Sequence, residues 1–182
     1  LPNYTIIIKS GQIGMTNFNN RGTDYAFSGI YVGGHGSSST DNGSRFLLVE
    51  GGEIANIIGG IATGSSYNAN LKTYIYVKGG VVQNIVGGAG VSTTYGDRII
   101  QVSGGEIAYN VAGGSNGYED SSSSATNPTG RLDGSTLVYV GGGAEIGTAG
   151  INNTLYNANA GNVFGAGLGD NRLSTSGQVY SS

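Results

Sequence analysis

Three glutamates that follow glycine-rich turns are the residues of this 182-residue chain best placed to do chemistry. Glu53, Glu106 and Glu145 occupy one column when the turns are aligned, together with Gln12 and Val81. Two carboxylates in one cleft could cleave a glycosidic bond, and a carboxylate base beside a cation could serve a polysaccharide lyase. A metal shared by neighbouring glutamates would need more oxygen ligands than this column provides. We therefore expect the three glutamates to be solvated and non-catalytic.

Other residue types that carry chemistry are sparse. His35 is the one histidine, and it follows two glycines with no acid or serine partner nearby, so neither a triad nor an imidazole metal site can be assembled from it. The chain has no cysteine, which excludes disulfides and thiolate metal sites. We predict no catalytic, metal-binding or cofactor-binding residues, no cofactor, and no enzymatic activity.

The dominant pattern is a repeat in which an apolar strand runs into a turn of small residues and then into an isoleucine or valine. Segments 46–60 and 74–88 are its clearest copies. Alignment of five copies gives three aliphatic columns: Ile6, Leu47, Ile75, Ile100 and Val138; Ile8, Val49, Val77, Val102 and Val140; Ile13, Ile54, Val82, Ile107 and Ile146. Residues two apart share one face of a strand, so these columns predict parallel strands stacked with one face buried.

The repeat length and the absence of helical periodicity indicate the fold class. Gly52 and Gly80 are 28 residues apart, about one turn of a parallel β-helix. We predict an all-β fold, a right-handed parallel β-helix (β-solenoid) of about five coils, because parallel crossovers are right-handed. Residues 1–182 are expected to form one domain with insertions at about 14–29, 115–133 and 148–160. The chain opens almost directly in a strand, without a signal peptide or membrane span, and we expect it to be a piece of something longer.

Asparagines recur before two apolar residues and a glycine. The four positions are Asn56, Asn84, Asn110 and Asn162. Asn tolerates turn conformations, and stacked amides can donate and accept hydrogen bonds along a column. We predict a structural asparagine ladder, which the first repeat lacks because residues 28–34 contain no asparagine.

The outward positions of the first strand are unusually apolar. The candidate interface consists of Phe46, Leu48, Tyr74, Tyr76, Ile99, Leu137 and Tyr139. A face exposed to water should alternate with polar residues, so this one is expected to be covered. The insertions could cover it, with Tyr25, Phe27, Tyr118 and Tyr156 as anchors; another domain or subunit could dock there; or the tyrosines could stack against sugars.

Charge excludes one class of partner. The net charge is −3 and the 8 lysines and arginines are scattered, which argues against nucleic-acid binding. The remaining charges gather where the chain enters the first strand of each repeat: Asp41 with Arg45, Asp97 with Arg98, and Arg131 with Asp133. We expect exposed ion pairs there, of little energetic weight.

Segments 51–60 and 79–88 resemble the glycine-rich "GG-x-I-x-N-apolar-x-GG" repeats of large bacterial surface and adhesin-like proteins, and similar repeats occur in some phage structural proteins. The resemblance implies an extracellular location, on a bacterial surface or a virion, and a module that binds or builds. The expected function is a non-enzymatic structural or adhesive module whose outward strip docks a neighbouring domain or subunit, with self-association the favoured partnership and glycans a further candidate. The alternatives are a polysaccharide-binding or polysaccharide-cleaving β-helix enzyme and a phage fibre or tailspike module.

Overall fold

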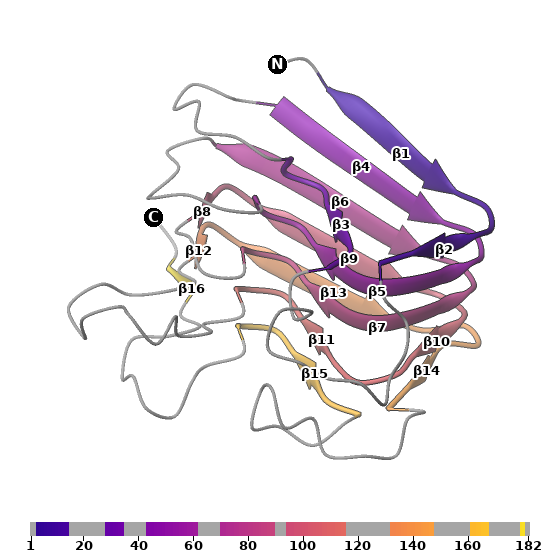
Figure 1. Ribbon diagram of the computed structural model, residues 1–182. Helices are drawn as coiled ribbons and strands as arrows, with labels where there is room; N and C mark the ends of the chain where they lie inside the picture. The colour runs from indigo at the N-terminus through magenta and orange to yellow at the C-terminus, as the bar shows by residue number, and fades with distance from the viewer. Residues whose placement is uncertain are drawn as a thin grey trace, which may run out of the picture.

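All regular structure that the computed structural model describes is β-strand, paired in parallel. The structure describes residues 3–14, 28–34, 43–61, 70–89, 94–115, 132–147, 161–167 and 179–180. Within these residues the strands form three sheets, of five, eight and three strands (Figure 1). The predicted all-β class is therefore confirmed, and so is the parallel pairing of its strands.

The first sheet contains one strand from each of the five repeats. In spatial order these are β1 (Tyr4–Ile8), β4 (Gly43–Val49), β6 (Leu71–Val77), β9 (Arg98–Val102) and β13 (Thr136–Val140). Ile6 pairs with Leu47, Leu47 with Ile75, Ile75 with Ile100, and Ile100 with Val138. The two aliphatic columns predicted for this strand are thus confirmed, with each residue beside its counterpart in the next repeat.

The second sheet contains the strands that follow the turns. Its members are β2 (Gln12–Ile13), β3 (Ile30–Tyr31), β5 (Glu53–Ile58), β7 (Val81–Val86), β10 (Glu106–Ile107), β11 (Val111–Ala112), β14 (Glu145–Ile146) and β15 (Val163–Phe164). The predicted third aliphatic column is also in register, from Ile13 through Ile54, Val82 and Ile107 to Ile146. We use the word layer for one strand of the first sheet together with the second-sheet strands that follow it in the chain. The first layer is β1 to β3 and the last is β13 to β15.

A third, smaller sheet was not anticipated. It consists of β8 (Thr94–Tyr95), β12 (Leu132–Asp133) and β16 (Val179–Tyr180), in the order β16, β12, β8. Strands of two residues are too short to show a period in the sequence. β12 occupies the end of the predicted insertion at 115–133, whereas the proposed anchors Tyr25, Phe27, Tyr118 and Tyr156 lie outside the described residues.

Glycine turns connect the first sheet to the second. Gly11, Gly52, Gly80 and Gly105 have φ of 100°, 95°, 88° and 81°, a region that disfavours side chains. A Cβ on Gly80 would also lie 2.6 Å from the carbonyl oxygen of Gly52 in the preceding layer. Both the backbone conformation and the close stacking of turns therefore require glycine here.

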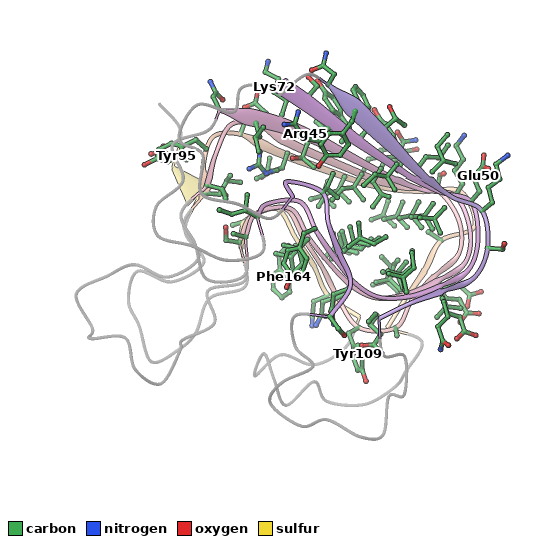
Figure 2. All side chains as sticks on the ribbon, turned by 45° about the horizontal axis from the view of Figure 1, so that its top comes forward. Arg45, Glu50, Lys72, Tyr95, Tyr109 and Phe164 are labelled. Atoms are coloured by element: carbon green, nitrogen blue, oxygen red, sulfur yellow. The ribbon has the colours of Figure 1, made fainter. Side chains whose placement is uncertain are left out.

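The core lies between the first and second sheets. Leu47, Ile75 and Ile100 from the first sheet and Val82 and Ile107 from the second are all fully buried in one aliphatic cluster. Figure 2 shows these rows of side chains filling the interior, one layer behind another. Among the described residues no helix is long and apolar enough to cross a membrane.

Candidate binding surface on the first sheet

The seven residues of the predicted interface come together on the outer face of the first sheet. Phe46, Tyr74, Ile99 and Leu137 are consecutive partners across four strands, and Leu48, Tyr76 and Tyr139 belong to the adjoining outward column, in which Gln101 lies between the two tyrosines. We call these seven residues the outer strip. Their assembly follows from strand alternation, because the residues between the inward aliphatic columns must point the other way.

Phe46 and Tyr74 stack on one another within the outer strip. Their rings stack with centroids 4.5 Å apart and planes 5° apart. Both residues are half-buried, as are Leu48, Tyr76 and Ile99 in the same central strands. The outer strip is thus partly packed in its middle, whereas at its end Leu137 and Tyr139 are 58% and 56% exposed.

A shallow depression of about 460 Å³ opens beside the strip. It is lined by Thr5, Phe46, Leu47, Leu48, Tyr76, Lys78, Gln101 and Ser103. Aromatic and aliphatic walls are combined there with an ammonium, an amide and hydroxyl groups. Such a lining offers apolar contact and a few hydrogen-bonding groups, the mixture found in ligand sites.

Polar residues border the outer strip on both sides. At the beginning of the strands Lys72 Nζ lies 3.7 Å from Asp97 Oδ2, and the amide of Ser135 donates to Asp97 Oδ1 over 3.1 Å. At the other end of the strands, Glu50 and Lys78 are exposed in adjacent layers. Figure 2 shows Lys72 and Glu50 at the opposite ends of the first-sheet strands. The apolar surface therefore has a charged rim.

The carboxylate column lies elsewhere, at the start of the second-sheet strands. Glu53, Glu106 and Glu145 are exposed, as predicted, and Glu106 pairs directly with Glu145. Gln12 Nε2 donates to Glu53 Oε2 over 3.4 Å. No group of three or more His, Asp or Glu residues able to hold a metal occurs in the described part of the chain. His35 lies outside it.

The asparagines align in register and form two hydrogen-bonded pairs. Asn84 Nδ2 donates to Asn56 Oδ1 over 3.1 Å, and Asn162 Nδ2 donates to Asn110 Oδ1 over 3.2 Å. Between the pairs, Asn84 Oδ1 and Asn110 Nδ2 are buried without a hydrogen-bond partner. The column is therefore interrupted once, at its centre, between one free acceptor and one free donor.

In the first layer a backbone carbonyl takes the place of the missing asparagine. Asn56 Nδ2 donates to the carbonyl oxygen of Ser28 over 3.0 Å. Gly29 occupies the position next to Asn56, with a φ of 148°, and a Cβ there would collide with the backbone of Asn56. The glycine brings the chain close enough for the carbonyl to accept this bond.

The prediction of exposed ion pairs at the start of the first-sheet strands is wrong for two arginines, which are buried. Arg45 and Arg98 are 0% and 1% exposed, in an inward column of the first sheet with Thr73 between them. The strand period that places Leu47 inward also places Arg45 inward, two residues earlier, and this signal was available in the sequence. The guanidinium of Arg45 lies 4.5 Å from the centroid of the Tyr4 ring. Asp41 and Arg131, the other proposed partners, lie outside the described residues.

Backbone carbonyl oxygens rather than carboxylates hold Arg98. Its Nη1 donates to Leu71, to Gly96 (3.1 Å) and to Asp97 (3.1 Å), and its Nη2 donates to Tyr95 over 3.2 Å. Burial lowers the pKa of Arg98 to about 10, while the charge of Asp97 acts in the opposite direction. Since this pKa still lies well above neutrality, Arg98 is a buried cation that holds together the corner where the third sheet turns into the first.

Compared with known proteins, the chain matches no family model, no curated protein and no solved structure. Its class is therefore defined by its own architecture, an all-β protein of stacked parallel layers that carries an aromatic strip on one outer face.

Proposed function

We propose that this chain is a non-enzymatic structural module, an extracellular right-handed parallel β-helix whose outer strip docks a neighbouring domain or subunit. The parallel register of successive layers supports the β-helix, and right-handed crossovers are the general rule for parallel strands. The repeats that resemble those of bacterial surface proteins support the extracellular location.

One observation carries the docking function: the outer strip is apolar over adjacent strands and has a charged rim. Contiguous apolar surfaces bordered by polar residues mark interaction sites. A fully buried leucine or aromatic side chain contributes about 1.5–3 kcal/mol, so covering even the exposed end of the strip, at Leu137 and Tyr139, favours association. A charged rim adds specificity and orients the partner.

Site-specific photo-crosslinking tests the docking surface. Because the chain has no cysteine, Tyr76→Cys provides a unique attachment point on the strip, and Gln83→Cys provides a matched point on the second sheet. We expect the strip position to yield covalent products between copies of the protein and the control position to yield none. Equal crosslinking at both positions, or none at the strip at high protein concentration, would contradict the proposal.

The non-enzymatic part of the proposal has its own test. Incubation with a panel of polysaccharides, followed by analysis of reducing ends and unsaturated products, should detect no cleavage. Turnover that disappears in Glu106→Gln or Glu145→Gln would overturn this reading and assign the exposed carboxylates a catalytic role.

A glycan-binding function is the second candidate, favoured by the depression beside the strip. Its aromatic walls and the polar groups of Lys78 and Gln101 suit the apolar face and the hydroxyl groups of a sugar ring. A glycan array with the wild type and Tyr76→Ala tests it. Binding that is lost in the variant, without cleavage, would favour this candidate over protein docking.

A further inference from the structure

The large hydrophobic side chains exposed among the described residues are confined to the two ends of the stack. They are Ile7 (52%), Leu137 (58%), Tyr139 (56%), Val140 (37%) and Val163 (47%). Ile7 belongs to the first layer and the other four to the last. The same residue types in the intermediate layers are buried or half-buried, because each has a neighbour on both sides.

The inward side chains show the same contrast. Ile6, Ile8 and Ile13 in the first layer, and Val138 and Ile146 in the last, pack against the core yet remain only partly buried. Their counterparts in the layers between are fully buried. Near the glycine turns, each end of the aliphatic core is therefore left open by the described residues, whereas Ile30 and Val32, farther along the first layer, are buried.

Where the first-sheet strands end, one series of backbone amides donates to the carbonyl groups of the preceding layer. The amide of Glu50 donates to the carbonyl of Ile8 (2.8 Å), that of Lys78 to Val49 (2.8 Å), that of Ser103 to Val77 (2.8 Å) and that of Gly141 to Val102 (2.9 Å). Within the described residues β1 pairs with β4 alone and β13 with β9 alone. The next members of this series are the amide of Lys9 at the open edge of β1 and the carbonyl of Val140 at the open edge of β13.

We propose that copies of this chain stack head to tail, with the last layer of one copy pairing in parallel with the first layer of the next. The partner is a second copy because the open edges complement one another: β13 presents the acceptor that the amide of Lys9 requires. The apolar columns continue as well, with Ile6 placed on Val138 and Ile13 on Ile146.

One polar contact also matches across the proposed junction. Stacking places Gln12 of the following copy beside Glu145, an amide beside a carboxylate, just as Gln12 lies beside Glu53 within the chain. An interface that joins two different surfaces gives a ring if its rotation closes and an open filament if it does not, and continuing the stack along its own axis gives the filament. The junction is formed by the end layers and shares Leu137 and Tyr139 with the outer strip, but it does not depend on the docking function.

Proline substitutions at the two open edges test the junction. Alternation within the ladder directs the amides of Ile7 and Val140 away from their neighbouring strands, so Ile7→Pro and Val140→Pro each block one end while leaving the internal pairs intact. Ile7→Thr and Val140→Thr are matched controls that keep the amide and the branched shape. Circular dichroism checks that every variant retains its strands.

Light scattering at increasing protein concentration measures the molar mass, and therefore the oligomeric state, of each variant. We expect the wild type and both threonine variants to form growing oligomers and each proline variant to remain a single chain. An equimolar mixture of the two folded proline variants should form a dimer and nothing larger, since only one pair of open ends remains. A wild type that stays monomeric, proline variants that assemble like the wild type, or a mixture that forms no dimer would overturn the proposal.

Discussion

Asn84 donates a hydrogen bond to Asn56 from one layer to the next, and both side chains are buried among aliphatic neighbours. The amide of each asparagine pair points toward the N-terminal layer, which gives the column a direction. The bond satisfies polar groups that the corner of the second sheet would otherwise bury without a partner.

Replacing Asn84 should destabilise the protein. Asn84→Ala removes the donor to Asn56, and we expect the free energy of unfolding to fall by about 1–3 kcal/mol. Gln83→Ala, at the half-exposed neighbouring position, is the control and should change it by less than about 0.5 kcal/mol. Equal losses in a urea titration would show that the ladder contributes nothing specific.

The stability lost on replacing a turn glycine by alanine should depend strongly on the position of that glycine. Gly80→Ala places a side chain at a φ of 88° and against the carbonyl of Gly52, so we expect a loss of about 2 kcal/mol or more. At Gly143, in the last layer, a Cβ would meet nothing within 4 Å, and Gly143→Ala should be nearly neutral. Thermal unfolding of the two variants measures the difference, and similar melting temperatures would refute the stacking argument.

Arg98 is expected to contribute far more to the free energy of unfolding than the exposed Lys72. Arg98→Ala deletes four hydrogen bonds to carbonyl oxygens and leaves a cavity, and should cost about 3–5 kcal/mol. Lys72→Ala removes an ion pair whose side chains are 55% and 43% exposed, and should cost less than about 1 kcal/mol. Denaturant midpoints of both variants provide the comparison; a neutral Arg98→Ala would contradict the structural role.

Aromatic stacking on the outer strip should be measurable as a coupling. In a double-mutant cycle with Phe46→Ala and Tyr74→Ala, we expect a coupling energy of about 0.5–1.5 kcal/mol, because the rings stack with their planes 5° apart. Additive effects of the two substitutions would mean that the rings do not stack in solution.

Tyr31 predicts a loss of stability at alkaline pH. Burial raises the pKa of Tyr31 from 10.0 to about 12, so the folded state retains a proton that the unfolded state releases. This contribution to the free energy of unfolding is fully present below pH 10 and is lost as the pH rises toward 12, by about 1 kcal/mol when partial exposure is taken into account.

Tyr31→Phe should remove that part of the alkaline loss, as judged by denaturant midpoints at pH 9 and pH 11.5. Ultraviolet titration provides a second readout, because the variant should lack one phenol that ionises near pH 12. If the missing phenol is instead one that ionises near pH 10, the assignment is wrong.

The sequence by itself determined the layered pairing and its register. Leu47, Ile75, Ile100 and Val138 recur at one offset from a turn, and strand alternation converts that offset into a buried column in any parallel stack. The outer strip follows from the same rule, because residues between inward positions must face outward. These features depend on short-range periodicity, which a single sequence displays directly.

Only the tertiary structure decided how the buried polar groups find hydrogen-bond partners and which apolar groups are exposed. The guanidinium of Arg98 has partners in the interior because carbonyl groups from two separate segments converge on it, and that convergence depends on how the corner folds. The break between Asn84 and Asn110, and the exposure of Val140 at the end of its column, likewise depend on what lies in the adjacent layer. Hydrogen-bond satisfaction and exposure at the ends are properties of the assembled stack, so no local pattern specifies them.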